Sequence, residues 1–484
     1  MPGVPGCFPF LKRKSAPAAP APAPALSPAA QVEGCESHSH SHSHSSPSSG
    51  PFPCDGLCDF LIPPVPAEAW DAPPKYDFER FGGYAFDEEA SRTVEAAIEA
   101  VAGELRDLSL KIHDHPELMF KEYYAHDQLT AYMESHGFAV TRRYKGLETA
   151  WLATVTVGKG GRTLGFNSEM DALPGIGHAC GHNLIAIGGV AAAIGVAAAL
   201  KKHSLPGTVS LIGTPAEEGG AGKAILLERG AYDDFAACLM IHPTRGEKLT
   251  TGLASTLAIE RLDAEFAGHT AHASAAPWEG RNALDAAFVS YAAVSALRQQ
   301  VKPTHRIHGV VEGRDWAANI IPDYAKMSYF IRAPSYKEVM DLEPRMRACF
   351  EAAAHATNTK LTFGTSTFMY DLFQNSALGA EYTRIVESRY GMRVGVGSVG
   401  EVRASTDFGN ITYALPGLHP GYAIPTVENG GNHTRQFTAA AATLEAHEAT
   451  LLAAKGIALA GMRVLLDKEF AQRVMQDFKA GKPQ

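Results

Sequence analysis

The segment "MDALPGIGHACGHN", residues 170–183, places two histidines, one cysteine and one aspartate in a glycine-rich turn. Cys180 and His182 are two residues apart, and in a strand-to-helix loop alternate residues can point the same way. A thiolate and an imidazole are ligands that zinc and related ions accept. The pair predicts a shared metal ion, although a single Cys-x-His pair needs further ligands beside it.

Two later segments supply such ligands. "LIGTPAEEGG" ends an apolar run in Glu217 and Glu218, and "FAACLMIHP" ends another in His242. Taken alone, the glutamate pair also fits a solvated helix N-terminus, and a lone histidine fits the rim of a sheet. Unrelated histidines have no reason to collect at three consecutive strand ends. Together these segments predict a centre of two metal ions.

Such a centre has a defined chemistry. Two divalent ions about 3.5 to 4 Å apart can hold a hydroxide and polarise a carbonyl group, while a nearby carboxylate carries the proton to the leaving amine. The side chains of adjacent residues point in different directions, so one glutamate of the pair can bind metal while the other exchanges a proton with water. The pattern therefore indicates hydrolysis of an amide bond.

The elements around these residues predict an α/β fold. Strand-like runs occur at 150–157, 163–168, 208–213 and 236–241, and the second and third are separated by "GGVAAAIGVAAALKK". Strands that alternate with helices imply a largely parallel sheet covered on both faces, with a site at the strand ends. The small residues of the helix would let its backbone approach the sheet closely.

Residues 256–368 follow a different pattern. They predict a strand (256–266), a helix (281–300), two strands (305–312 and 321–332), a helix (336–356) and a strand (359–368). This β-α-β-β-α-β order is typical of a small two-layer domain. We expect it to be inserted into the larger domain, whose two parts are residues 86–255 and 369–484.

The N-terminal segment lacks the residues needed for a core. Residues 15–53 consist of Ala-Pro, Ser-His and Pro-Ser repeats, so we expect residues 1–85 to be disordered. The run "HSHSHSH" has no fixed geometry for a metal, and Cys54 and Cys58 have no second cysteine pair nearby. A specific metal site in this segment is not expected.

The composition limits the classes of function that we expect for this protein. The formal charge of -9 over 484 residues argues against a nucleic-acid surface. Seven dispersed cysteines fit a reducing compartment. The first residues lack the apolar region of a signal peptide, and no run of about 18 apolar residues appears later. We expect a soluble cytoplasmic protein that acts on small molecules, with neither nucleic acid nor membrane as a partner.

The motifs also resemble a known family. "DALPGIGHACGHN", "PAEE", "IHP", "GHTAHASAAPWEGRNALDA", "NIIP" and "NHT" occur in the order found in the aminoacylase and carboxypeptidase family of two-metal peptidases, metallopeptidase family twenty. The resemblance spans about residues 90 to 465. It is strongest to the branch that contains the Xaa-Arg (β-alanyl-lysine type) dipeptidases and the aminobenzoyl-glutamate hydrolases. It implies a mixed-sheet catalytic domain of the co-catalytic metallopeptidase type, with an inserted α+β lid or dimerisation domain.

The resemblance assigns roles to individual residues. Cys180 would bridge two zinc or manganese ions, with Glu218 and His433 completing one site and His182 and His242 the other. His419 in "GLHPGY" is the alternative to His433. Glu217 would be the general base and then the acid. Asp171 would orient a metal ligand, or else cap the turn.

The inserted domain would contribute to catalysis in a homodimer. By resemblance, His272 in "GHTAHAS" reaches the neighbouring subunit's site and stabilises the oxyanion. A hydrogen bond donated by its imidazole would become stronger as negative charge develops on that oxygen, which favours catalysis. Asn319 and Arg332 match positions that contact substrate, and Arg332 would clamp a free carboxylate. Without the resemblance, His272 would read as a solvent-facing residue and Arg332 as an edge charge.

These features predict a metal-dependent hydrolase that releases an amino acid from a dipeptide, and a dipeptide with a basic C-terminal residue is one of the expected substrates. Asn183 and the "NSEMD" segment favour this dipeptidase-like group over plant-type auxin-conjugate hydrolases. An N-acyl-amino-acid or aminobenzoyl-glutamate hydrolase is the alternative enzyme. A metal-binding module without catalysis is the alternative of another class, which an intact Glu217 argues against.

Overall fold

The computed structural model describes residues 88–364, 368–395 and 404–481. The segment predicted to be disordered (1–85), with its histidine run and with Cys54 and Cys58, lies outside the described residues.

The helices and strands are as follows. The α-helices are α2 (Glu88–Ala100), α3 (Ala102–Asp114), α4 (Tyr123–Ser135), α5 (His182–Lys202), α6 (Gly222–Glu228), α7 (Ala283–Leu297), α8 (Tyr336–Ala356), α9 (Ser376–Tyr390), α10 (Phe408–Ala414), α11 (Arg435–Ala441), α12 (Leu444–Leu466) and α13 (Lys468–Gly481). The strands are β1 (Ala139–Arg142), β2 (Trp151–Val157), β3 (Thr163–Glu169), β4 (Gly207–Thr214), β5 (Phe235–Leu239), β6 (His242–Arg245), β7 (Thr250–Gly252), β8 (Ala258–Ala267), β9 (Arg306–Gly313), β10 (Tyr324–Ala333), β11 (Lys360–Phe363), β12 (Phe368–Met369), β13 (Arg393–Val394), β14 (Gly417–Leu418) and β15 (Gly421–Ile424).

The largest sheet has six strands in the order β1-β2-β4-β3-β5-β14. Strands β4, β3, β5 and β14 run parallel, whereas β2 is antiparallel to both β1 and β4. The predicted α/β fold with a mixed sheet is confirmed. The sheet is less parallel than the strand pattern implied, because the segment 158–162 between β2 and β3 is too short for a crossover helix.

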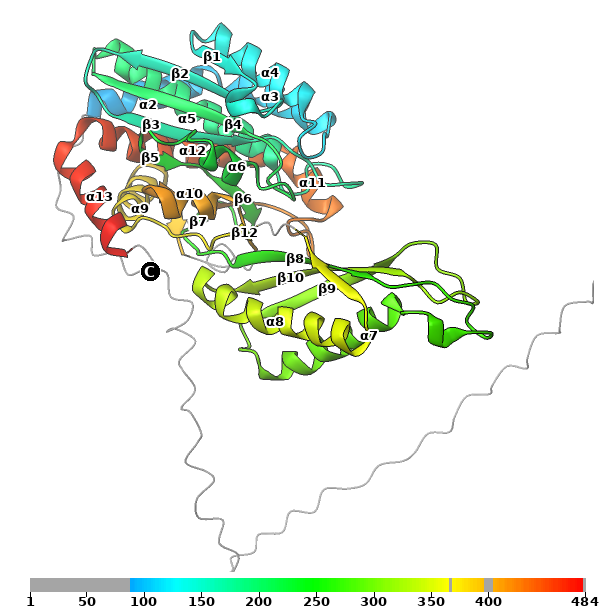
Figure 1. Ribbon diagram of the computed structural model, residues 1–484. Helices are drawn as coiled ribbons and strands as arrows, with labels where there is room; N and C mark the ends of the chain where they lie inside the picture. Colours follow the sequence, from blue (N-terminus) through cyan, green and yellow to red (C-terminus); the bar gives the residue numbers. More distant parts are fainter. Residues whose placement is uncertain (1–87, 365–367, 396–403, 482–484) are drawn as a thin grey trace, which may run out of the picture. The chain divides into compact units, whose positions relative to one another are not determined.

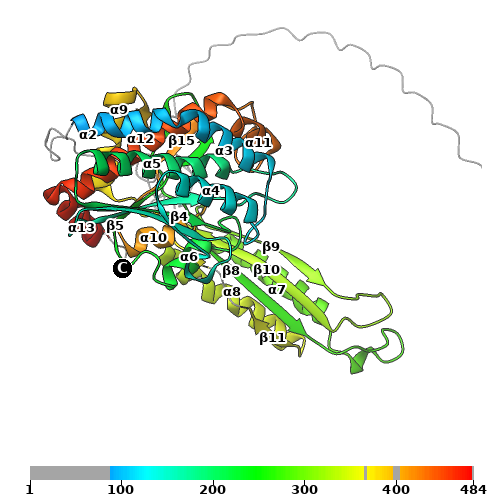
Figure 2. The same ribbon diagram turned by 90° about the horizontal axis from the view of Figure 1, so that it is seen from above.

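Helices cover both faces of this sheet (Figures 1 and 2). Helices α2, α3, α5 and α12 form the main core with one face, and α6 and α10 pack with the other. Three of the four predicted strands end within one residue of the expected position, and the fourth, predicted to end at 241, ends at Leu239. Because β3 lies between β4 and β5, the turns after these strands meet at one edge of the sheet.

Helix α5 approaches the sheet closely, as its small residues predicted. A Cβ atom on Gly189 would lie 2.5 Å from the backbone oxygen of Asn167 in β3, and one on Gly188 would lie 2.6 Å from Ile241 Cδ1. Neither distance is possible for a real side chain. The two glycines therefore set the spacing between the helix and the sheet, and with it the position of His182 at the first turn of the helix.

Helices α5 and α12 also have the length and composition of membrane-spanning helices. The expectation that no long apolar run occurs was wrong, because residues 184–200 of α5 consist only of Leu, Ile, Ala, Gly and Val. In each helix, most of the apolar window is buried inside the protein, 94% for α5 and 83% for α12, and the two helices pack against each other. Both are core helices of this fold.

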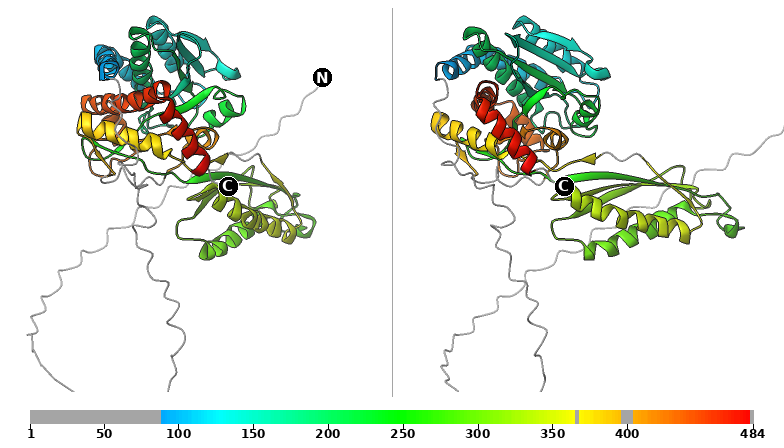
Figure 3. Two further views of the ribbon diagram at one scale, coloured as in Figure 1. Left: turned by 90° about the vertical axis from the view of Figure 1, so that its left-hand side faces the viewer. Right: turned by 60° about the vertical axis from the view of Figure 1, so that its left-hand side comes forward.

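A second sheet has the order β11-β8-β10-β9, with antiparallel neighbours and with β12 also paired to β8. Helices α7 and α8 cover one face and share a separate core with it (Figure 3). The order of elements is the predicted β-α-β-β-α-β. The predicted last strand (359–368) is instead divided into β11 and β12, and residues 365–367 between them lie outside the described part. The predicted domain boundaries stay a prediction.

A third sheet, β13-β7-β15-β6, was not anticipated. Its strands have two to four residues each, which is too short to produce a recognisable alternation of apolar and polar residues. Strand β6 begins with His242, and it pairs in parallel with β15 so that His242 lies opposite Gly421. This small sheet therefore fixes one of the candidate metal ligands.

The close approach of α5 can be tested by unfolding. We expect Gly189→Ala to lower the free energy of unfolding by about 1 to 3 kcal/mol, because the added methyl group must displace the backbone of β3. Gly103→Ala in α3 is the matched control, since no atom lies within 4 Å of its Cβ position. It should be neutral or stabilise by up to about 1 kcal/mol. Equal effects of the two substitutions in denaturant titrations would contradict the close-contact account.

Candidate metal centre and catalytic loop

Cys180 and His182 lie at the junction between the turn after β3 and helix α5. Gly181, the residue between them, caps the helix with a φ of 81°. A side chain there would also collide with Pro243, because its Cβ would lie 2.6 Å from Pro243 Cγ. The glycine therefore allows the chain to turn sharply, and both flanking side chains are buried at the edge of the sheet.

The ring of His242 is held by the backbone carbonyl of the next residue. Its Nδ1 lies 2.8 Å from the carbonyl oxygen of Pro243, so the proton belongs on Nδ1 and Nε2 is left with a free lone pair. That Nε2 is 3.4 Å from Cys180 Sγ. Burial lowers the pKa of His242, which keeps the imidazole neutral and suited to bind a metal.

His433 reaches the same place from the C-terminal part of the chain. Its backbone adopts a φ of 66°, and its N–H donates to the carbonyl oxygen of Ala179 at 2.8 Å. Its Nε2 lies 3.4 Å from Glu218 Oε2. A residue that is neither glycine nor asparagine seldom adopts this left-handed backbone conformation, so the fold directs this ring toward Glu218.

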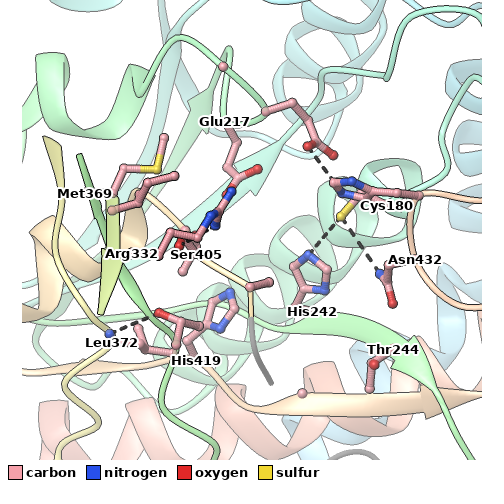
Figure 4. A pocket seen from close by; sticks show the side chains of 18 of the residues that line it. Cys180, Glu217, His242, Thr244, Arg332, Met369, Leu372, Ser405, His419 and Asn432 are labelled. Atoms are coloured by element: carbon pink, nitrogen blue, oxygen red, sulfur yellow. Dashed lines mark hydrogen bonds and ion pairs between the residues drawn. The ribbon is translucent and has the colours of Figure 1, made fainter. Parts of the chain in front are cut away.

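Two sets of potential ligands share Cys180. Figure 4 shows Cys180 beside His242, a member of one of these sets. Cys180, His182 and His242 form one set, and Cys180, Glu218 and His433 form the other. Within each set the ligand atoms lie within 4.8 Å of one another. The structure therefore brings together the five residues that the sequence suggested as ligands, in the predicted grouping.

The donor atoms fit bound cations. Among the described residues, His182 Nε2 and Glu218 Oε1 are buried without a hydrogen-bond partner, which is costly in a protein interior. A carboxylate oxygen of Glu169 lies 3.3 Å from His182 Nε2, at ion-pair distance but without the geometry of a hydrogen bond. Burial also raises the pKa of the Cys180 thiol, so its thiolate requires a cation beside it. Two borderline-soft divalent ions would satisfy the sulfur, the imidazoles and the carboxylate.

Asp171 forms a hydrogen bond with one residue of each ligand set. Its Oδ1 accepts from His182 Nδ1 at 3.1 Å, which leaves Nε2 facing the metal position. Its Oδ2 accepts the backbone N–H of Glu218 at 3.0 Å. These contacts are compatible with the orienting role, which stays a prediction, and a simple turn cap would not explain the bond to the histidine ring.

Glu217 lies beside both sets. Its carboxylate is 3.9 Å from His182 Nε2, and the residue is only 7% exposed. Burial, together with the carboxylates of Glu169 and Glu218, raises the pKa of Glu217 well above its ordinary value. A carboxyl group with a raised pKa is suited to accept a proton from water and to return it later.

His419, the alternative ligand, is placed differently. Its ring centroid is 5.7 Å from that of His242, but the residue belongs to neither ligand set. Burial lowers the pKa of His419 to about 3, so the ring is neutral. The geometry favours His433 as the ligand and leaves His419 in the wall of the cavity.

A cavity of about 710 Å³ extends from the ligand sets to the second sheet. Arg332 on β10 lines its far wall, and its Nη1 donates to Ser405 Oγ at 2.9 Å. Arg261 on β8 lines the same wall. On adjacent antiparallel strands, Arg261 lies opposite Phe330, so the two arginines occupy diagonal positions of one face.

His272 and Asn319 are not at this cavity. Both are exposed, on loops beyond the far end of β8, and the backbone N–H of Ala273 donates to the Asn319 carbonyl at 3.0 Å. From Arg261 to the end of β8 at Ala267, a strand extends about 20 Å. The two residues thus lie together, but away from the chain's own metal ligands.

The sequence analysis missed a buried charge network beside the ligands. Glu169 at the end of β3, Lys223 in α6 and Asp407 before α10 are all fully buried. Glu169 and Asp407 stand in "NSEMD" and "STDFGN", but nothing in those segments indicates that they meet. Lys223 follows "EEGGAG", where a lysine ordinarily faces solvent. Only the fold brings the three together.

Comparison with known proteins agrees with this geometry. Residues 165–454 match the model of peptidase family M20/M25/M40. The chain is 38% identical to the Xaa-Arg dipeptidase of Mus musculus, over 79% of this chain and 90% of that one. It is 28% identical to one of the p-aminobenzoyl-glutamate hydrolase chains of Escherichia coli, over 81% and 95% of the two proteins.

Solved structures share the fold. A dinuclear metal binding peptidase of the M20 family from Bacillus subtilis superposes with a TM-score of 0.56 at 21% identity, over 76% of this chain and 99% of that one. The family model covers more than half of the chain, and the mouse relative is similar over nearly its whole length. The chain therefore belongs to peptidase family M20/M25/M40 and is a hydrolase.

Proposed function

We propose that this protein hydrolyses the amide bond of dipeptides with the help of two divalent ions. The observation that carries the proposal is the pair of ligand sets that share Cys180 and flank Glu217. Cys180, His182 and His242 would hold one ion, and Cys180, Glu218 and His433 the other. Zinc or manganese suits these ligands. When bound, the ions would polarise the substrate carbonyl and activate water.

The chain's own residues would move the proton. Glu217 would accept a proton from the attacking water as its oxygen bonds to the carbonyl carbon. It would then donate that proton to the amide nitrogen as the C–N bond breaks, which releases a free amine and a carboxylic acid, and the acid loses its remaining proton to solvent. Asp171 would keep the ring of His182 and the backbone of Glu218 in place throughout.

Arg332 would hold the other end of the substrate. Its guanidinium group can pair with the free carboxylate of a C-terminal residue, while its Nη1 is steadied by Ser405. Dipeptides with a basic C-terminal residue follow from the activity for which the mouse relative is named. In the described wall of the cavity, the acidic residues are Glu217 and Glu218, so a basic side chain would need an acidic partner from elsewhere in the assembly.

One observation favours a second candidate substrate. Arg261 lies diagonal to Arg332 in the same wall, and a second guanidinium group suits a second carboxylate. The side chain of Arg261 is 42% exposed, although its Nε also bonds Asp263 at 3.1 Å. An N-acyl-glutamate, the class named for the Escherichia coli relative, is therefore the alternative substrate.

We also propose a homodimer in which His272 and Asn319 serve the partner's site. Nδ1 of His272 accepts the backbone N–H groups of Ser274 and Ala275 at 3.2 and 3.1 Å. The ring proton must then sit on Nε2, ready to donate to an oxyanion. Strand β9 ends its sheet without a second neighbour among the described strands, and it exposes Val310 and Val311, which supports pairing with a second copy.

The cytoplasm suits this chemistry. Within the described part of the chain, Cys180, Cys238 and Cys349 are free thiols. A reducing compartment would protect the Cys180 thiolate from oxidation, which would remove the shared ligand.

The hydrolase activity can be tested with substrates of different classes. We expect wild-type protein loaded with zinc or manganese to release an amine from dipeptides with basic, acidic or apolar C-terminal residues, or from N-acyl amino acids. Glu217→Gln should lower kcat by about 100- to 10,000-fold with the same substrate, because the proton carrier is lost. Chromatography of the released amine gives the rate. Equal rates for the two proteins would refute the role of Glu217.

The ligands can be tested by metal content. We expect about two ions per wild-type chain after dialysis, fewer than one after Cys180→Ser, and about one after His433→Ala. His419→Ala is the matched control, since it removes a buried histidine of the same cavity and should leave both ions bound. Elemental analysis measures the content. Loss of metal from His419→Ala but not from His433→Ala would reverse the assignment.

The partner's role can be tested by complementation. Glu217→Gln and His272→Ala should each be nearly inactive alone. A one-to-one mixture after subunit exchange should recover about one quarter of wild-type activity, because half of the dimers would carry one intact site. Exchange is followed with differently tagged chains. Proven exchange without recovery would contradict the shared site.

A further inference from the structure

The buried charges beside Glu217 form a compact group. Glu169, Lys223 and Asp407 are fully buried, and the oxygens of Glu169, Glu217 and Asp407 lie within 4.8 Å of one another. Three carboxylates this close repel one another strongly in a protein interior. A cation placed among them would offset this repulsion.

The Lys223 ammonium group is that cation. Its Nζ lies 2.6 Å from Glu169 Oε1 and 2.5 Å from Asp407 Oδ1. Its backbone N–H also donates to Asp407 Oδ2, at 2.8 Å. Burial alone would lower the pKa of Lys223, but Asp407 and Glu169 raise it above its ordinary value, so the side chain stays charged. The Lys223 ammonium group thus occupies the position among three carboxylates at which a metal ion could otherwise bind.

The loop that Lys223 follows is strained. Ala216 and Ala221, on either side of Glu217 and Glu218, adopt left-handed backbone conformations with φ of 60° and 50°. Such conformations cost about 1 kcal/mol or more each in residues with a Cβ and persist only where surrounding contacts impose them. Gly222 cannot carry a side chain either, because its Cβ would lie 1.9 Å from the Pro215 carbonyl oxygen.

The contacts that impose this loop come from three directions. Glu122 accepts the N–H of Ala216 at 3.0 Å, and Asp171 accepts that of Glu218, so the first half of the loop is fixed. The second half is held by Lys223, through Asp407 before α10 and through Glu169 at the end of β3. Helices α6 and α10 also pack against each other. Removing Lys223 would therefore free one end of the loop that carries both glutamates.

A role in stability alone would not explain this group. Buried ion pairs contribute little to stability compared with apolar residues of the same size, because desolvating the charges offsets their attraction. We propose that Lys223 is a positioning residue, whose buried ammonium group ties the loop carrying Glu217 and Glu218 to β3 and α10. This inference rests on the proposed function, since it gives the loop its catalytic purpose.

The test compares two buried lysines. Lys223→Met removes the ammonium group while keeping the length of the side chain. The matched control is Lys455→Met in α12, because Lys455 is 7% exposed and pairs with Glu99 far along the chain from the loop. We expect Lys223→Met to lower kcat at least about 100-fold, with KM changed less than about threefold and both metals retained, as for a misplaced catalytic group. Lys455→Met should keep kcat within about twofold.

A second variant guards against misfolding. Lys223→Met/Asp407→Asn removes the ammonium group together with one of its partner carboxylates, and it keeps Glu169, whose Oε2 lies 3.3 Å from Nε2 of His182, so less buried charge is left unpaired than in Lys223→Met. It should fold and still show the loss of kcat. A wild-type kcat in this variant, or equal effects of Lys223→Met and Lys455→Met, would overturn the proposal.

Hydrogen exchange separates this proposal from the proposed function. The backbone amides of Gly220 and residue 223, in the second half of the loop, should exchange slowly in wild-type protein and in Lys455→Met, and faster in Lys223→Met. This readout needs no substrate. If no dipeptide or N-acyl amino acid is hydrolysed, the proposed function fails while the positioning role is still decided by exchange. Unchanged protection of these amides in Lys223→Met would contradict the positioning role even in an active enzyme.

Discussion

The site depends on buried carboxylates that bind backbone N–H groups of a strained loop. Glu122, Asp171 and Asp407 accept the N–H groups of residues 216, 218 and 223 in turn. A loop with two left-handed alanines would relax without them. Each carboxylate belongs to a different part of the fold: the start of α4, the turn after β3 and the start of α10. The loop is therefore attached to three different parts of the domain.

This arrangement explains why so much negative charge is buried at one edge of the sheet. The carboxylates that hold the loop lie close to those that would bind metal and carry protons, and their mutual repulsion must be offset. The ammonium group of Lys223 offsets part of this repulsion. Divalent ions held by Cys180, His182, Glu218, His242 and His433 would offset the rest. Metal binding and the stability of this edge should accordingly be coupled, because ligands kept together without metal repel one another.

The sequence predicts the chemistry of the site better than its support. Cys180, Glu217 and His242 follow apolar runs that end at one edge of a sheet, so their meeting could be inferred from strand order and from resemblance to known motifs. The element order of the second sheet follows from periodicity in the same way. In contrast, Lys223 and Asp407 are in contact although 184 residues separate them, and neither neighbourhood indicates a partner. The third sheet was not predicted because its strands are too short to show an alternation of apolar and polar residues.

The position of His272 shows a further limit. Its motif suggests catalysis, whereas within one chain it lies beyond the end of β8, away from the ligand sets. In the proposed dimer, a role in a second copy of the chain rests on an exposed ring with a fixed proton and on strand β9, which has one neighbour among the described strands. Whether a motif serves its own chain or a partner is decided by distance, which sequence spacing does not encode.

X-ray absorption spectroscopy of the zinc-loaded protein tests the two-metal account most directly. The account predicts a sulfur ligand at about 2.3 Å in addition to nitrogen and oxygen ligands, and metal–metal scattering at about 3.5 to 4 Å. Both signals should disappear in Cys180→Ser. A spectrum with only nitrogen and oxygen neighbours and no second metal would contradict a centre that is bridged by Cys180.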